Sequence, residues 1–176
     1  MGSPRRTHSG ESRPSKPEPL CSIERTAQLM GDRWTVLILR EVLLYRLERF
    51  ADIERILRIA PNILTDRLTS LVDAGLLRKV EYREAGSRAR FAYQPTPAGE
   101  DLKLVLAAMQ QWGDEHIPPA AGVTIARETA SGHRPVHLGF VDAAGAEHPL
   151  DDIAFVPTAA YEPREGSQTA GATRQD

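Results

Sequence analysis

The sequence has little cysteine, few aromatic residues and no long apolar run. Its 176 residues include one cysteine, Cys21, and 6% aromatic residues. A single thiol excludes an internal disulfide and a cysteine-rich zinc site, although an intermolecular disulfide or a reactive thiol stays open. No apolar stretch approaches the roughly 18 residues of a membrane-spanning helix, and no apolar segment near the start suggests a secretory signal. We therefore expect a cytoplasmic protein without a membrane partner.

The chain also has almost no net charge, because its basic and acidic residues nearly balance. The chain holds 22 basic and 24 acidic residues, a formal net charge of −2. Residues 1–19 carry four basic and two acidic groups, residues 20–116 carry fourteen of each, and residues 117–176 carry four basic and eight acidic. A nucleic-acid partner depends on how charge is distributed rather than on its total. The balance therefore excludes no class of partner.

Composition divides the chain into four segments. Residues 1–19 and 162–176 have almost nothing to bury, so we expect them to be disordered tails. The length suits one domain of about 100 to 150 residues plus extras. We assign residues 20–116 to the main domain and residues 117–161 to a small β-rich appendage of unknown role.

Apolar residues recur at helical spacing in four segments of the main domain. Ser22 and Asp32 are candidate N-caps, Pro61 suits a first helical turn, and Gly75 suits a helix end. The helix that follows Asp32 has so wide an apolar surface that it must be central to the core. The expected helices span residues 22–30, 32–45, 49–57 and 61–75.

After Gly75 the apolar period changes from helical to alternating. Residues 76–82 and 90–95 alternate and are separated by a turn with Gly86, which predicts a β-hairpin. A fifth helix over residues 96–116 follows, with Thr96 as N-cap. Its apolar stripe consists of Leu102, Val105, Leu106, Met109 and Trp112. The order predicts a mainly α fold with a small hairpin, a winged helix-turn-helix of the α+β class.

The appendage pattern differs from that of the main domain. "VTIAR", "PVHLGFVD" and "DIAFV" between residues 123 and 156 suggest three short strands. The histidines His133, His137 and His148 lie here without cysteines or close ligand spacing, so we expect surface polar groups rather than zinc ligands. We predict no metal and no cofactor.

The expected helix 61–75 has one apolar and one polar face. The apolar side chains are Leu64, Leu68, Leu71 and Val72, and the opposite sector holds Asn62, Asp66, Thr69 and Asp73, with Thr65 at its edge. A surface helix commonly has such a face, but a preceding short helix and a following basic hairpin favour a helix that reads DNA. Asn62 can pair with adenine, and Thr65 offers thymine a hydroxyl and a methyl group. Asp66 requires a donor such as the cytosine amino group.

The hairpin has a local excess of positive charge. Its charged residues are Arg78, Lys79, Arg83, Arg88 and Arg90, against Glu81 and Glu84. Such a patch suits phosphate contacts, which supply most non-specific affinity for DNA. A solvated hairpin with ordinary surface charge is the alternative.

Several motifs in order resemble the HxlR-type bacterial transcriptional regulators, winged helix-turn-helix proteins related in architecture to the MarR group. The resemblance covers residues 21–116 and rests on Cys21 before the first helix, "GDRWTVLILREVLL", "RFADIERIL", "IAPNILTDRLTSLVDAGLL", "RFAYQPTPAG" and "WGDEH". It implies a cytoplasmic homodimer on a roughly palindromic double-stranded DNA operator. The first and last helices would form the subunit interface, and the "LTDRL" helix would enter the major groove.

The resemblance assigns roles to particular residues. The recognition helix would present Pro61, Asn62, Thr65, Asp66 and Thr69 to the groove, with Arg67 flanking it, and Arg88 and Arg90 would serve the wing. We add Arg83 to the wing because of its charge in the hairpin. The dimer interface would use Leu20, Ile23, Ala27, Leu102, Val105, Leu106, Met109 and Trp112, although the last five also suit a core-facing stripe. Ala60 stands where the family usually has a capping Ser, which removes about 1 kcal/mol of helix stabilisation. Asn62 and Asp66 stand where the family often has Lys and Gln, so the operator cannot be copied from relatives.

Cys21 is a candidate redox sensor. It precedes a helix N-terminus, whose partial positive charge favours a thiolate, and some relatives sense oxidants at this position. Packing under the dimer helices is the alternative role.

We expect a repressor whose inducer is an oxidant, an electrophile or a small molecule. A winged-helix module that binds protein instead of DNA is the alternative function, and enzymatic activity is not expected.

Overall fold

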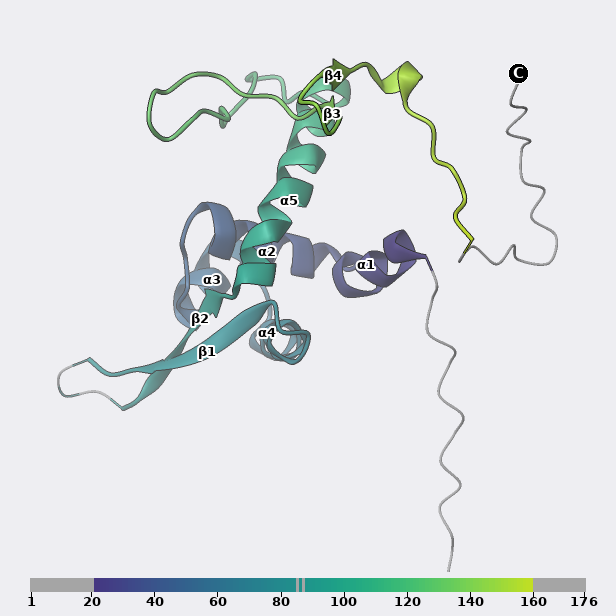
Figure 1. Ribbon diagram of the computed structural model, residues 1–176. Coiled ribbons are helices and arrows are strands. Elements are labelled where there is room, and N and C mark those ends of the chain that lie inside the picture. Colours follow the sequence, from purple (N-terminus) through teal and green to yellow (C-terminus); the bar gives the residue numbers. More distant parts are fainter. Residues whose placement is uncertain (1–20, 85, 87, 160–176) are drawn as a thin grey trace, which may run out of the picture.

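The computed structural model describes residues 21–84, 86 and 88–159 (Figure 1). Leu20 and both predicted tails lie outside the described residues. The helices are α1 (Ser22–Met30), α2 (Arg33–Leu44), α3 (Phe50–Leu57), α4 (Pro61–Asp73) and α5 (Pro97–His116). The strands are β1 (Leu77–Tyr82), β2 (Arg90–Pro95), β3 (Phe140–Val141) and β4 (Glu147–His148), and a 3₁₀ turn, η1, covers Leu150–Asp152. The predicted winged helix-turn-helix architecture is confirmed.

Helix α2 is the centre of the core, as its wide apolar surface predicts. Ile38, Leu39 and Val42 are fully buried in it, and the helix contacts α1, α3, α4, α5 and β2. Asp32 caps its N-terminus, because Oδ1 accepts hydrogen bonds from the backbone N–H groups of Trp34 (2.9 Å) and Thr35 (3.3 Å). The cap fixes where the central helix begins and therefore how α1 enters the fold.

One predicted cap is displaced by a residue. Ser22 is the first residue of α1, and Cys21 occupies the N-cap position in extended conformation. In α1 only Met30 is buried, so most of this helix faces outward. Ile23 and Ala27, which the sequence places at a dimer interface, are among the exposed residues.

Strands β1 and β2 form the predicted antiparallel hairpin. Leu77 pairs with Pro95 at its base, and Tyr82 pairs with Arg90 near its tip. Only Leu77 and Tyr93 of its strands are buried. The base thus belongs to the core and lies beside α4, while the far end of the hairpin projects from the body, away from α4 (Figure 1).

The appendage has less regular structure than the sequence predicts. Only a two-residue pair of strands, β3 and β4, and an isolated bridge between Glu128 and Pro135 form among its described residues. The strands expected for "VTIAR" and "DIAFV" are wrong, because neither segment finds a partner strand and both are largely exposed. Strand pairing, rather than local alternation, decides whether such short segments become strands.

The appendage is fixed to the C-terminal half of α5, at the end of that helix away from the hairpin (Figure 1). The Gln110 side chain donates to the carbonyl of Ile125 (2.7 Å). The Gln111 amide exchanges two hydrogen bonds with the backbone of Leu138 (2.9 and 2.7 Å). Among the described helices, none is long and apolar enough to cross a membrane.

Candidate nucleic-acid interface

Helices α3 and α4 form a helix-turn-helix through a tight connection. Helix α3 ends at Leu57, and Arg58 adopts the left-handed conformation (φ 50°) that turns the chain. Ala60 is the N-cap of α4 and Pro61 is its first residue. The methyl side chain of Ala60 cannot accept a hydrogen bond from the first turn, so α4 lacks the side-chain cap that α2 has.

The polar side chains of α4 lie together on the exposed side of the helix. Leu64, Leu68 and Leu71 are buried and hold the helix on the core. The exposed residues on the other side are Pro61, Asn62, Thr65, Asp66 and Thr69. These are five of the six positions predicted for the recognition helix, and the structure leaves them available to a ligand.

Two hydroxyl groups on this surface are oriented by the helix backbone. Thr65 donates its hydroxyl hydrogen to the carbonyl of Pro61 (2.8 Å), and Ser70 donates to the carbonyl of Asp66 (2.9 Å). Each oxygen keeps lone pairs that can accept from a base or a water. Ser70 is exposed as well. It was not predicted as a site residue, because it lies at the margin of the polar sector.

Arg67 is held differently from the other predicted residues of the recognition helix. Its Nε lies 3.1 Å from Oδ1 of Asp32, the residue that caps α2, and both side chains are partly exposed. The guanidinium therefore joins α4 to α2. Asp32 was predicted only as a helix cap, because its second role depends on a residue 35 positions away.

The three wing arginines are exposed and make no ion pair with a described residue: Arg83, Arg88 and Arg90. The other two basic side chains of the hairpin are engaged. Arg78 donates to the side chain of Gln94 (3.0 Å), and the Lys79 ammonium lies 3.9 Å from the centre of the Phe91 ring.

An acidic residue at the hairpin tip is already paired. Arg49, which precedes α3, binds Glu84 at 2.8 Å and lies over the ring of Tyr82 at 4.8 Å. Glu84 therefore repels a phosphate less than its sequence position suggests, because a neighbouring cation balances it. Arg49 was not among the predicted site residues.

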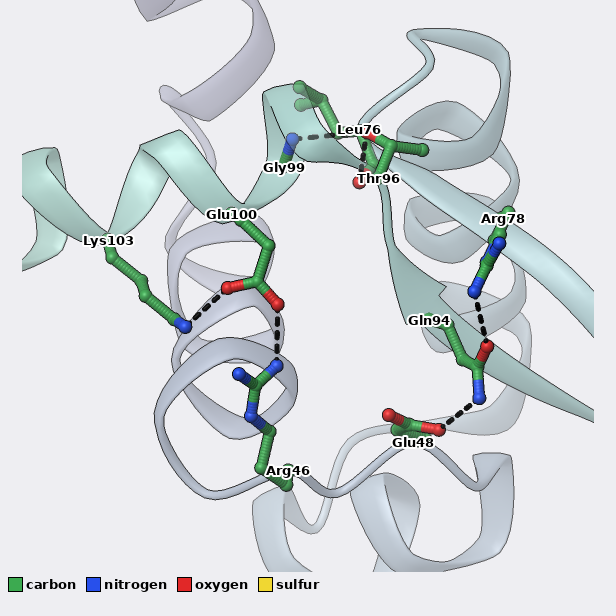
Figure 2. A network of polar contacts seen from close by, with 9 residues as sticks. All are labelled: Arg46, Glu48, Leu76, Arg78, Gln94, Thr96, Gly99, Glu100 and Lys103. Atoms are coloured by element: carbon green, nitrogen blue, oxygen red, sulfur yellow. Dashed lines mark hydrogen bonds and ion pairs between the residues drawn. The ribbon is translucent and has the colours of Figure 1, made fainter.

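A polar network anchors the hairpin base (Figure 2). The Gln94 amide donates to Glu48 (2.9 Å) while accepting from Arg78, which joins β2 to the loop before α3. The Thr96 hydroxyl donates to the carbonyl of Gly75 (2.7 Å) and accepts from the N–H of Gly99 (3.1 Å), so the predicted cap of α5 also holds the end of α4.

Two further contacts stiffen this anchor at the start of α5. Glu100 pairs with Lys103 and with Arg46 (Figure 2). Hydrogen bonds from Lys103 and then Arg46 lower the pKa of the Glu100 carboxyl, which stays ionised. Gly99 packs so closely on the chain that an added Cβ would lie 2.0 Å from the carbonyl oxygen of Leu76. The orientation of the wing relative to α4 is therefore set at its base.

The apolar stripe of α5 is divided between two surroundings. Leu106 is buried and belongs to the core, and Leu102 packs against it. Val105, Met109 and Trp112 are exposed, and Trp112 leaves 59% of its surface to solvent. Core packing accounts for the first two side chains, whereas the last three have little cover from the described chain.

A shallow apolar groove runs between α1, α2 and α5. Its volume is about 440 Å³. It is lined by apolar side chains from all three helices, namely Ile23, Ala27, Met30, Val36, Val105 and Met109. Ile23 and Ala27 are exposed, so the predicted dimer residues of α1 lie beside the exposed half of the α5 stripe. We call this surface the α1–α5 groove.

Cys21 lies at the rim of the α1–α5 groove. Its thiol is exposed and free, and the next two residues, Ser22 and Ile23, line the groove. Arg25, which the sequence places one turn away, donates to the Ser22 hydroxyl at 3.2 Å. A modification of Cys21 would therefore change the edge of this apolar surface.

Metal ligands are not gathered anywhere in the described residues. No cluster of three histidine, cysteine or acidic residues there has the geometry to hold a metal ion. His148 instead binds two carboxylates, Asp142 at 3.1 Å and Asp152 at 3.2 Å.

Comparison with known proteins agrees with this geometry. Residues 29–121 match the HxlR-like helix-turn-helix family. The chain belongs to this family. The match covers more than half of the chain and spans α2 to α5 with the hairpin. The chain therefore carries the helix-turn-helix of this family, and curated relatives that it matches are named as helix-turn-helix transcriptional regulators.

Individual HxlR-like relatives resemble large parts of the chain. The uncharacterised helix-turn-helix transcriptional regulator Rv3095 of Mycobacterium tuberculosis is 39% identical over 104 residues, which are 59% of this chain and 64% of that protein. The chain thus matches less than two thirds of that relative's length. The crystal structure of PA1607, a candidate transcription factor, aligns with a TM-score of 0.68 at 26% identity, over 79% of this chain and 96% of that one. The candidate transcription factor PA1374 from Pseudomonas aeruginosa gives 0.56 at 36% identity, over 81% and 95%.

Proposed function

We propose that this HxlR-like protein binds a double-stranded DNA operator as a homodimer and represses transcription. The observation that carries the proposal is the pairing of two exposed surfaces on contacting elements. The polar face of α4 is free of the core, and β1 packs against the same helix, in a hairpin whose wing arginines make no ion pair with a described residue. Such a protein acts where the DNA is, in the bacterial cytoplasm.

In this proposal α4 contacts the bases and the wing contacts the phosphates. Asn62 and Thr65 on α4 read base edges in the major groove, and Asp66 accepts from a cytosine amino group there. Arg83, Arg88 and Arg90 bind phosphates, which supplies affinity without sequence preference. The anchored hairpin base holds the wing at a fixed distance from α4, so phosphate contacts also set the register of the recognition helix.

The homodimer forms through the α1–α5 groove. Ile23, Val105, Met109 and Trp112 would leave water there, and a two-fold interface buries the same patch on both subunits. Two recognition helices then meet successive major-groove segments about 34 to 36 Å apart, which requires a roughly palindromic operator.

Oxidation of Cys21 is the proposed releasing signal, since the thiol is exposed at the rim of the dimer surface. With diamide, two thiols become one disulfide, and the diamide takes up two electrons and two protons. The new bond changes the interface and lowers operator affinity. A Cys21→Ser protein should keep its affinity under diamide; equal loss in both proteins contradicts this role, and an apolar small molecule is then the remaining candidate inducer.

Selection of bound sites from randomised DNA, with and without diamide, tests DNA binding, palindromy and redox control together. We expect an enriched inverted repeat whose recovery falls with diamide. An Asn62→Ala protein should keep its affinity for random DNA but lose preference at one base pair of each half-site. No enrichment with the purified protein would contradict the operator proposal.

A winged-helix module that binds protein is the competing function. Salt separates the two, because DNA affinity falls steeply between about 50 and 200 mM salt as phosphate contacts are lost. A flat salt dependence, unchanged when Arg88 and Arg90 become Ala, would favour the protein partner.

A further inference from the structure

The last described segment of the chain, residues 149–159, leaves the body of the subunit as an extended strap. In Figure 1 it descends from the C-terminal end of α5 toward the level of α1 and stays apart from the α5 ribbon. Its apolar side chains have almost no cover: Leu150 is 73% exposed, Phe155 83% and Val156 64%. An aromatic side chain so exposed loses the stabilisation that burial would give it, which indicates a surface outside this subunit.

The direction of the strap is fixed at its start. His148 binds Asp142 through Nε2 (3.1 Å) and Asp152 through Nδ1 (3.2 Å), so η1 is held against the β3–β4 turn. Oδ1 of Asp142 holds that turn by accepting from the N–H groups of Ala144 (2.8 Å) and Ala146 (3.0 Å). The strap therefore leaves a folded anchor in a defined direction.

Two prolines restrict the backbone of the strap. Pro149 is extended (φ −70°, ψ 157°), and so is Ile153 (φ −95°, ψ 120°). Pro157 restricts Val156 to extended conformations and fixes its own φ. These restrictions lower the conformational entropy that the strap loses when it enters a binding surface.

We propose that the strap of each subunit seats Phe155 and Val156 in the α1–α5 groove of the partner subunit. The inference rests on the proposed homodimer. The groove holds about 440 Å³ and is lined by apolar side chains, so Phe155 and Val156 would leave water on entering it. It is continuous with the exposed α5 residues of the proposed dimer surface.

The length of the strap is compatible with binding in such a groove. The appendage is anchored on α5 at Gln110 and Gln111, and the groove begins less than two helical turns earlier, at Val105 and Met109. An extended strap advances about 3.3 Å per residue, so four residues after η1 cover about 13 Å. The same segment stays exposed and does not line its own groove in this subunit, which leaves Phe155 and Val156 free to enter the groove of a partner.

The single natural cysteine permits a direct test by cross-linking. Cys21 lies at the groove rim, and Ala154 is an exposed neighbour of Phe155. A size-tagged Cys21→Ser, Ala154→Cys chain is co-expressed with the untagged natural chain, and the purified protein is oxidised with diamide. We expect a reducible tagged–untagged dimer.

Two controls accompany the cross-linking. A tagged Cys21→Ser chain has no thiol and must give no mixed product. A tagged Cys21→Ser, Ala130→Cys chain carries its thiol at an exposed position of the appendage outside the strap, and it should give much less mixed dimer than the Ala154→Cys chain. Equal yields from the two positions would contradict a seat for the strap.

Sedimentation of the full chain measures how much the strap contributes to the dimer dissociation constant. Phe155→Asp should raise the dimer dissociation constant about 10- to 50-fold, the loss expected when an apolar side chain no longer leaves water. Val141→Asp, an exposed apolar residue of the same appendage outside the strap, is the matched control and should change it less than about twofold. Unchanged thermal unfolding of both variants by circular dichroism shows that the fold is retained.

The outcomes separate this inference from the proposed function. A natural chain that dimerises and binds operator DNA, but gives no mixed disulfide and no effect of Phe155→Asp, overturns the strap alone. An Ala154→Cys chain that keeps Cys21 and closes a disulfide within itself overturns the strap as well. A natural chain that stays monomeric while bound to DNA overturns both the dimer and the strap.

Discussion

Arg67 and Asp32 connect the recognition helix to the central helix. The Nε atom of Arg67 lies 3.1 Å from Oδ1 of Asp32, and this same oxygen accepts the backbone N–H of Trp34 at 2.9 Å. One carboxylate therefore caps α2 and holds α4. Because Ala60 supplies no cap to α4, this ion pair is a main polar constraint on where α4 sits.

Arg67→Ala is expected to weaken operator binding by about tenfold without changing its salt dependence, since Arg67 positions α4 and neutralises no phosphate. Thermal unfolding should show a loss of about 1 kcal/mol, the range for a partly exposed ion pair. Binding measured over a salt series checks the first point. A slope reduced by about 1 would instead identify Arg67 as a phosphate contact.

Arg88→Ala and Arg90→Ala are expected to weaken binding to operator and random DNA by similar factors. Each should reduce the slope of log affinity against log salt by about 1, because one phosphate contact is lost. Arg134→Ala, an exposed arginine of the appendage, is the matched control and should leave the slope unchanged. A loss confined to the operator sequence would contradict a backbone role for the wing.

Gly99→Ala is expected to destabilise the protein by about 2 kcal/mol or more, because the new Cβ would lie 2.0 Å from the carbonyl oxygen of Leu76. Gly113→Ala in the same helix is the control. Its Cβ meets only the Ile117 side chain, at 3.9 Å, so helix propensity should make it neutral or stabilising by about 0.5 to 1 kcal/mol. Urea unfolding of both variants measures the difference, and equal effects would contradict the close contact.

Ala60→Ser is expected to stabilise the fold by about 1 kcal/mol, because Ala60 already has the extended conformation of an N-cap (φ −63°, ψ 136°). The serine hydroxyl could then accept an N–H of the first turn of α4. The melting temperature of the variant should rise. If it does not, the first turn of α4 already has another partner, such as ordered water.

Local signals in the sequence were sufficient for most of the fold. Asp32 and Thr96 cap the helices that they were predicted to cap, and the hairpin strands lie within a residue of their predicted limits. Caps, turns and apolar periods act over a few residues, so the sequence displays them directly. The polar face of α4 was predictable for the same reason.

Contacts between distant residues were not predictable in this way. The ion pair between Arg67 and Asp32 joins residues 35 positions apart, and the α5 stripe is divided between the core and an exposed surface. Two of the expected strands in the appendage are missing from the described residues because no partner strand lies beside them. Each of these outcomes depends on which elements meet in space.

The sequence by itself determined the helices, the hairpin and the family, since caps, periods and motif order are properties of neighbouring residues. The tertiary structure alone decided which charges are available to DNA. Arg78 is engaged with Gln94 and Glu84 with Arg49, while the wing arginines make no ion pair with a described residue. The physical reason is that charge pairing depends on distances across the fold, which sequence separation does not specify.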